Sequence, residues 1–338
     1  MTSQAEIAAN QYRTPVVKKN LYRGAALNTA AGNSRTSFVE NWPKGPALYM
    51  TLVTVHITLT VGTAAGPITD GILNYIKQMY YKTSNGETLV DNLSARALIM
   101  GPAILKAGTV PEFDQIAAAN GTYNVQIPIY HSDPLTKRPE DLFVDTRLYD
   151  SFELDITLGQ MSDLFTTPGT ASVTATVDID LVRSQDTLPA NVSAIGYSAY
   201  MAPGQQDVTQ QTYINMTRAG DIYYKRLYIQ SASAGGGVWY GPNSDSIVQT
   251  LRVTDTDQTF ISNTDWLDNE KDNKQEYSLE AIMAGRNVID FCRDKSNKSA
   301  LYSNRNGLRL EWDNQAGVVA GDTVSLVAET YRKYKKVA

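Results

Sequence analysis

RPEDLFVDTRLYDSFELDITLG, residues 138–159, joins a turn-rich lead-in to a stretch in which apolar and polar residues alternate without error. The polar positions of that second half are Glu153, Asp155 and Thr157. A period of two predicts a strand that buries one face and exposes the other. The apolar positions, which form the predicted buried face, are Phe152, Leu154, Ile156 and Leu158.

A second stretch repeats this pattern about 156 residues later. KSALYSNRNGLRLEW, residues 298–312, also has a turn-rich lead-in, and its Leu308, Leu310 and Trp312 alternate with charged residues. Two copies of one strand with its lead-in predict two copies of one domain in tandem.

Further pairs of segments follow in the same order along the two halves of the chain. The offset between partners falls steadily from about 175 to about 150 residues, as progressive shortening of loops would produce. Eight or so strands and one helical excursion in each half predict an all-β fold of two tandem jelly-roll sandwiches. The paired segments are Ile72–Ile76 with Ile247–Leu251, Leu93–Met100 with Asn263–Met283, Val125–Ile129 with Val288–Phe291, Leu154–Ile156 with Leu308–Trp312, and Val177 with Val324–Ala328.

The repeat predicts how the 338 residues divide into domains. A linker is expected because RSQDTLPAN, which starts at Arg183, has the composition of a loop. The predicted parts are an extended or helical basic arm at 1–33, a first jelly roll at 34–184, a linker at 185–191, a second jelly roll at 192–332 and a basic tail at 333–338.

Two local signals in the first domain predict a turn and a helix end. Ser84-Asn85-Gly86 is a strong hairpin turn between two strand-like segments. The apolar pattern of Leu93–Met100 reads as one short helix, and Gly101-Pro102 is expected to stop it.

The composition is that of a globular protein rich in strands and turns. Hydrophobic residues make up 42% of the chain and charged residues 19%, and the 20 Tyr outnumber Phe and Trp together. The net charge of −5 argues against a protein coated in nucleic acid. No apolar run reaches the roughly 18 residues of a membrane span, and the N-terminus lacks the hydrophobic core of a signal peptide. We therefore expect a protein that is made and assembled in a cytoplasm.

Both ends of the chain are basic although the whole chain is acidic. Glu6 is the one acid among the basic residues of the arm, and the last eight residues, YRKYKKVA, contain no acid. The arm is either a frayed, solvated terminus or a segment that lies on an anionic surface. Basic residues at both ends favour the second interpretation, with a lipid headgroup layer or a genome as the surface. The residues expected to make these contacts are Arg13, Lys18, Lys19, Arg23, Arg332, Lys333, Lys335 and Lys336.

The residues that usually carry chemistry are sparse and scattered. His56 and His131 lie in separate segments, and Cys292 is expected to be a small buried residue. Asp178 and Asp180 share one face of a predicted strand, but that face is polar throughout, so both are expected to be solvated. The sequence predicts a protein that is not an enzyme and has no cofactor. It indicates no metal ligands, and it leaves a structural metal ion open.

The ordered set of segments resembles a known family. NVQIPIYHSDPLTKRPEDLFVDTRLYDSFELDITLG, residues 124–159, and GRNVIDFCRDKSNKSALYSNRNGLRLEW, residues 285–312, carry the resemblance. Together with the hairpin turn, they are similar to the double jelly-roll major capsid proteins of tailless icosahedral phages with an internal membrane, the tectivirus-like lineage.

The resemblance implies a structural role in a virion. It implies a homotrimer whose six jelly rolls form a pseudo-hexagonal capsomer that tiles an icosahedral shell over an internal membrane. The implied partners are other copies of this chain, neighbouring capsomers, penton or minor capsid proteins and anionic membrane lipids, with direct nucleic-acid contact as a second use of the basic ends. The implied location is the virion, and the host cytoplasm before assembly.

Two other function classes remain open at this point. A receptor- or sugar-binding β-sandwich of a virion spike could use Tyr80-Tyr81 and Trp239-Tyr240 as stacking platforms. A cupin-type enzyme would share the jelly roll, but it needs a cluster of His ligands, and no His-X-His spacing occurs.

Overall fold

The computed structural model contains two compact units, residues 1–196 with 334–338, and residues 197–333. The predicted linker and the predicted C-terminal tail lie outside the described residues. The structure describes residues 16–30, 34–41, 47–108, 111–136, 143–184, 195–199, 206–216, 222–233, 244–279, 284–296 and 299–332.

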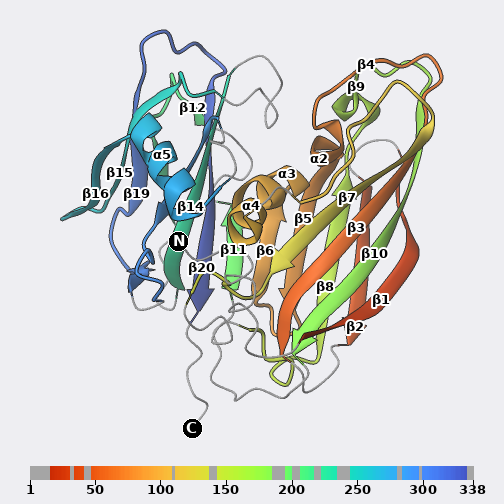
Figure 1. Cartoon of the computed structure of the whole chain (residues 1–338), viewed down its shortest axis with the longest axis horizontal. Helices are drawn as coiled ribbons and strands as arrows, with labels where there is room; N and C mark the ends of the chain where they lie inside the picture. Colours follow the sequence, from red (N-terminus) through yellow and green to blue (C-terminus); the bar gives the residue numbers. More distant parts are fainter. Residues whose placement is uncertain are drawn as a thin grey trace. The chain divides into compact units, whose positions relative to one another are not determined.

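Eight strands of the first unit are arranged as two antiparallel sets of four, of which the second is part of a larger sheet (Figure 1). The first sheet is, in order, β1 (Val16–Leu27), β10 (Ser172–Ser184), β3 (Leu48–Thr60) and β7 (Gly121–Tyr130). The second sheet is, in order, β2 (Ser34–Asn41), β8 (Ser151–Leu158), β5 (Ile76–Thr83) and β6 (Thr88–Leu93).

Alternating side chains of both sheets build the core of this unit. Val53, Val55 and Ile57 of β3 and Leu154 and Ile156 of β8 are fully buried, as the period-two pattern predicts. The inward positions of the opening stretch are therefore confirmed as core.

The second unit repeats this plan. In its first sheet β20 pairs with both β12 and β14, and β14 pairs with β17. These strands are β12 (Gln206–Asp207), β20 (Thr323–Arg332), β14 (Ile222–Ala232) and β17 (Arg286–Asp290). The second sheet is, in order, β13 (Tyr213–Asn215), β19 (Arg309–Asn314), β15 (Val248–Thr254) and β16 (Thr259–Asp265).

The strand order is the same in both units, which confirms the predicted duplication. Among the described residues, eight strands of each unit can be numbered from first to eighth along the chain. One sheet then reads first–eighth–third–sixth and the other second–seventh–fourth–fifth, in both units. The predicted strand pairs fall on equivalent strands where β7 matches β17, β8 matches β19 and β10 matches β20. The pair Ile72–Ile76 with Ile247–Leu251 is wrong in part: β5 is equivalent to β15, but of the first segment only Ile76 lies in β5, because Gly71–Tyr75 forms helix α2. This count leaves out β11 (Ile195–Ala199), at the boundary of the units, and the short strands β4 (Ala65–Pro67), β9 (Phe165–Thr167) and β18 (Leu301–Tyr302).

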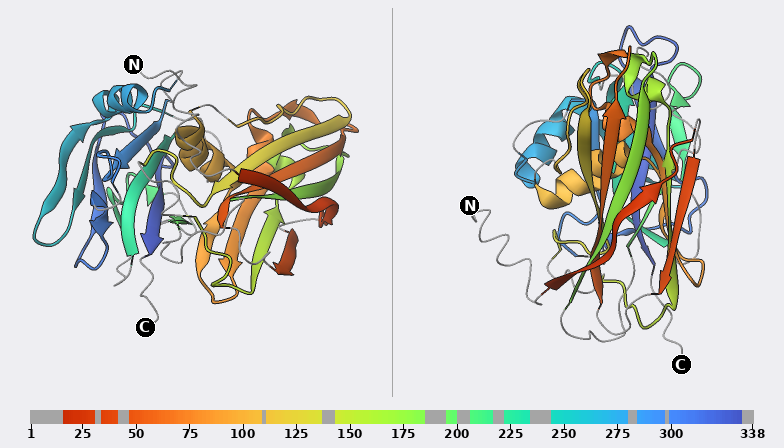
Figure 2. Two further views of the ribbon diagram at one scale, coloured as in Figure 1. Left: turned by 60° about the horizontal axis from the view of Figure 1, so that its bottom comes forward. Right: turned by 90° about the vertical axis from the view of Figure 1, so that its right-hand side faces the viewer.

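The helices also occupy equivalent places, between the fifth and sixth strands of each unit (Figures 1 and 2). In the second unit α5 (Trp266–Glu276) starts at the N-cap Asp265, whose carboxylate accepts from the backbone N–H groups of Leu267 and Asp268. The helical segment predicted at Asn263–Met283 starts three residues before the observed helix, because β16 continues to Asp265. The remaining short helices are α2 (Gly71–Tyr75) and η3 (Met161–Asp163).

The prediction that Gly101-Pro102 stops the helix of the first unit was wrong. Helix α3 (Ala95–Leu98) continues through a π-helical turn, η1 (Ile99–Ala103), into α4 (Ile104–Ala107). The wider π turn accommodates Pro102, which lacks an N–H and would clash in a regular α turn. The helix ends at Gly108, whose φ of 74° is the left-handed conformation of a C-terminal cap. The hairpin turn at Ser84-Asn85-Gly86, by contrast, is confirmed between β5 and β6.

The first sheet includes part of the segment predicted to be the extended or helical N-terminal arm. Strand β1 pairs with β10 from Val16 to Leu27 and forms the edge of its sheet. Tyr22 contacts Phe38 of the other sheet edge-on, with ring centroids 5.1 Å apart. The arm boundary predicted at residue 33 therefore includes a strand of the first jelly roll.

Candidate functional site

Two of the predicted surface-binding basic residues lie in an ion-pair cluster, which we call the β1 seam. Lys18 Nζ is 2.6 Å from Asp180 Oδ2, and Arg23 NH1 is 2.8 Å from Asp178 Oδ2. Asn20 Nδ2 also donates to Asp180 Oδ1 at 3.0 Å. The β1 seam, Lys18, Asn20, Arg23, Asp178 and Asp180, thus joins the edge strand to its neighbour by side chains as well as by backbone.

The seam corrects the expectation that both aspartates are solvated. Asp180 is 1% exposed because β1 covers it. Burial opposes ionisation of Asp178, but the backbone N–H of Gly24, Arg23 and His56 outweigh it and hold the pKa of the Asp178 carboxyl below its usual value. His56 does point outward, as predicted, with Nε2 3.3 Å from Asp178 Oδ2.

The other predicted residues of this set are not brought together by the described structure. Lys19 is exposed on β1, and Arg332 is the last residue of β20, where its backbone pairs with Ile222. The residues that lie outside the described ranges are Arg13, Lys333, Lys335 and Lys336.

The equivalent sheet of the second unit carries a buried cluster, which we call the Arg226 network. Arg226 Nε is 2.8 Å from Asp290 Oδ2, and its NH1 is 3.3 Å from Glu329 Oε1. Tyr228 donates to Glu329 Oε2 at 2.5 Å, and Tyr277 donates to Asp290 Oδ2 at 2.6 Å. The three charged side chains are at most 2% exposed, and they connect β14 to its neighbours β17 and β20.

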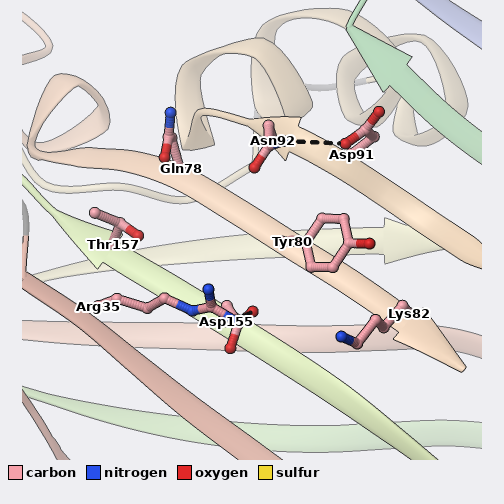
Figure 3. Close-up of a pocket in the computed structure, with 8 residues that line it drawn as sticks. All are labelled: Arg35, Gln78, Tyr80, Lys82, Asp91, Asn92, Asp155 and Thr157. Atoms are coloured by element: carbon pink, nitrogen blue, oxygen red, sulfur yellow. Dashed lines mark hydrogen bonds and ion pairs between the residues drawn. The ribbon is translucent and has the colours of Figure 1, made fainter. Parts of the chain in front are cut away.

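A trough of about 400 Å³ crosses the outer face of β2, β8, β5 and β6 (Figure 3). Arg35 of β2 contacts Asp155 of β8, and Lys82 Nζ of β5 lies 2.8 Å from Glu153 Oε2. The sequence predicts that Asp155 faces outward, but it does not reveal the strand register that brings Arg35 to it. The lining residues are Arg35, Gln78, Tyr80, Lys82, Asp91, Asn92, Asp155 and Thr157.

The histidine and cysteine positions show structural roles. His131 is fully buried and its Nε2 is 2.9 Å from Thr51 Oγ1. Burial and the nearby charge of Lys106 lower the pKa of His131 to about 3, so the ring is neutral. Cys292 is buried, as expected.

The described residues contain neither a candidate metal cluster nor a candidate membrane-spanning helix. Among them, no three His, Cys, Asp or Glu side chains gather in a way that could hold a metal ion. No helix that they form is long and apolar enough to cross a membrane. That the protein functions without a cofactor stays a prediction.

The sequence matches no protein-family model and no curated protein. Solved structures, by contrast, match almost the entire chain. The major capsid protein of Sulfolobus Turreted Icosahedral Virus has a TM-score of 0.68 at 14% identity, with 94% of this chain and 97% of that chain covered. The major capsid protein of bacteriophage PM2 has a TM-score of 0.54 at 14% identity, with 96% and 100% covered. The Faustovirus major capsid protein has a TM-score of 0.58 at 9% identity, with 95% and 90% covered.

The three matched structures are major capsid proteins of three different viruses. Because they cover both units, the likeness concerns the whole two-domain arrangement of strands and not one sandwich alone. At identities this low, a structural likeness establishes the fold. The predicted fold class is therefore confirmed: this chain has the double jelly-roll fold of these viral major capsid proteins.

Proposed function

We propose that this protein is a viral major capsid protein whose function is assembly. The observation that carries the proposal is the duplicated strand order, which matches capsid proteins over 94% or more of the chain. A sandwich that occurs twice in one chain lets three chains present six similar bodies, which is the symmetry of a pseudo-hexagonal capsomer.

The assembly has the chain itself as its main partner. We place it in a homotrimer, then in an icosahedral lattice beside neighbouring capsomers and penton or minor capsid proteins. The protein would occupy the host cytoplasm before assembly and the virion afterwards.

The basic ends are proposed to face an internal membrane of a bacteriophage. Because Lys18 and Arg23 are paired in the β1 seam, the remaining candidates are Arg13, Lys19 and the C-terminal basic residues. Each basic residue near an anionic lipid surface contributes about 1 kcal/mol. Phosphate contacts with a packaged genome are the other use of the same residues.

Size-exclusion chromatography with light scattering, followed by electron microscopy, tests the assembly proposal. We expect trimers that form shells or capsomer arrays as concentration rises. A monomer that forms neither trimers nor shells at any concentration would contradict the proposal.

Flotation with vesicles tests the proposed use of the ends. The variant with Lys333, Lys335 and Lys336 changed to Gln should bind phosphatidylserine vesicles more weakly, most clearly at low salt. Lys271→Gln, on an exposed face of α5, is the control. Unchanged vesicle binding with reduced DNA binding would instead assign the ends to the genome.

A further inference from the structure

We propose that Asp245 and Glu270 of the second unit share one proton and form a latch that holds the first turn of α5 against the segment before β15. Loss of that proton opens the turn locally. This inference goes beyond the proposed function because it concerns a single chain and does not depend on assembly.

The first argument is a contact between two carboxyl groups that no cation bridges. Glu270 lies on α5 and is 4% exposed, and its carboxyl group is within hydrogen-bond reach of that of Asp245. Glu270 Oε1 is sealed from solvent and accepts no hydrogen bond from the described residues. No cationic side chain is among the groups that chiefly set the charge of Glu270. Two carboxylates so placed repel, whereas one shared proton lets one carboxyl donate to the other.

The second argument is that the other charged groups around the pair are engaged elsewhere. On α5 itself, Asp268 and Lys271 pair with each other in solvent at 3.0 Å. Asp265, at the end of β16, caps the helix, and Arg286 of β17 reaches Glu270 with its backbone N–H. Burial, together with the contact to Asp245, raises the pKa of Glu270 to about 8, so the pair holds its proton at neutral pH.

The third argument identifies which side of the contact moves. The segment that carries Asp245 is fixed by its backbone, because Gln315 Nε2 donates to the Asp245 carbonyl at 2.7 Å. The Ser244 carbonyl accepts from a hydroxyl of β14 at 2.6 Å. The last turn of α5 is fixed as well, since Tyr277 donates to the Arg226 network at 2.6 Å. Repulsion within the pair therefore acts on the first turn of α5.

Trp266, in the first turn of α5, reports whether the latch is closed. Its ring is fully buried, and its Nε1 donates to Asp245 Oδ1 at 3.3 Å. Its carbonyl accepts from Asn287 Nδ2 at 2.9 Å, which ties the turn to β17 by a bond that carries no charge. An opening turn must release the indole N–H from Asp245, so exchange of that hydrogen with solvent measures the opening.

Hydrogen exchange of the Trp266 indole, followed by NMR on full-length protein labelled with 15N-tryptophan and corrected for the intrinsic rate, tests the latch. Between the ordinary pKa of 4.5 and the folded pKa of about 8, the closed turn binds one proton more than the open turn. The opening equilibrium should therefore rise about tenfold per pH unit in that window and level off above it. Glu270→Gln should abolish the pH dependence, and Asp268→Asn, an exposed carboxylate on the same helix, should keep it.

Trp312, which is 1% exposed on β19, is the internal reference for global unfolding. Trp266 should exchange faster than Trp312 and should not respond to low urea, because local opening exposes little surface. Equal exchange with equal urea dependence would overturn the inference, since global unfolding alone would then expose Trp266. A pH dependence that survives in Glu270→Gln, or its absence from the wild type, would overturn it too.

Discussion

The β1 seam and the Arg226 network occupy equivalent sheets of the two units, yet they hold their charges differently. In the β1 seam the basic side chains of Lys18 and Arg23 are 50% and 59% exposed. In the Arg226 network every charged partner is buried. Exposed pairs are screened by salt, whereas a buried charge must keep all its partners. The same strand order therefore carries an edge strand with solvent-exposed ion pairs, β1, in one unit. In the other unit it carries an inner strand with buried ion pairs, β14.

The largest effect should follow from breaking the Arg226 network. Arg226→Met leaves Asp290 and Glu329 buried without their cation, so unfolding should become easier by about 3–5 kcal/mol. Chemical denaturation followed by far-UV circular dichroism measures this change in the free energy of unfolding. Lys271→Met, which breaks an exposed pair on α5, should change the midpoint very little. A small loss for Arg226→Met would mean that the buried charges are solvated.

A carboxyl pair of the same unit, buried Glu270 and partly buried Asp245, should make stability depend on pH. Burial, together with the hydrogen bond and charge of Asp245, raises the pKa of Glu270 to about 8. Asp245 in turn accepts from the backbone N–H of Gly285 and, at 3.3 Å, from Trp266 Nε1. The pair therefore ties the start of α5 to the loop before β17.

The raised pKa of Glu270 determines whether stability rises or falls with pH. Between its unfolded pKa near 4.5 and its folded pKa of about 8, the folded state binds the extra proton, so this group's contribution to stability falls as pH rises. Glu270→Gln keeps a hydrogen-bond donor toward Asp245 without the second charge, and should be more stable than the wild type at pH 8 by at least about 1 kcal/mol. Melting temperatures from pH 5 to 9 measure it, with Asp268→Asn on the same helix as control. Parallel curves for wild type and Glu270→Gln would contradict the prediction.

Sequence patterns predicted the interior of this fold far better than its edges. The segment around Leu154 and the segment around Leu310 were paired correctly because core strands keep an uninterrupted period of two. Strand β1 was missed because register shifts between Asn20 and Tyr22 and between Tyr22 and Ala25 destroy that period.

The candidate sites were harder to predict because they depend on the partner strand. Asp155 and Asp180 are both recognisable as outward residues in the sequence. Nothing local shows that Arg35 and Lys18 cover them, since strand register over more than 100 residues is set by the packed sheets. Charge in a strand pattern therefore predicts the face but not the neighbour.

A smaller effect should follow from breaking the β1 seam. Asp180→Asn removes the charge that Lys18 and Arg23 share but keeps an acceptor for Asn20. We expect a loss of about 1–2 kcal/mol in the free energy that protects the backbone amides of β1, with little change in the second unit. Amide hydrogen exchange measures the protection of β1 and of the second unit separately, and Asp268→Asn again serves as the control. Equal loosening of both units would mean that β1 does not open independently.

The smallest effect should come from salt alone, and it isolates the contrast between the two sheets. Raising NaCl to about 1 M shortens the screening length to roughly 3 Å, which weakens exposed ion pairs more than buried ones. Amide exchange in β1 should then speed up roughly two- to fivefold, because its seam pairs involve half-exposed Lys18 and Arg23. Exchange in β14 should stay constant, since its network is shielded from solvent. Sodium sulfate at equal ionic strength is the control for anion-specific effects. If β14 responded as strongly as β1, burial would not be what distinguishes the two clusters.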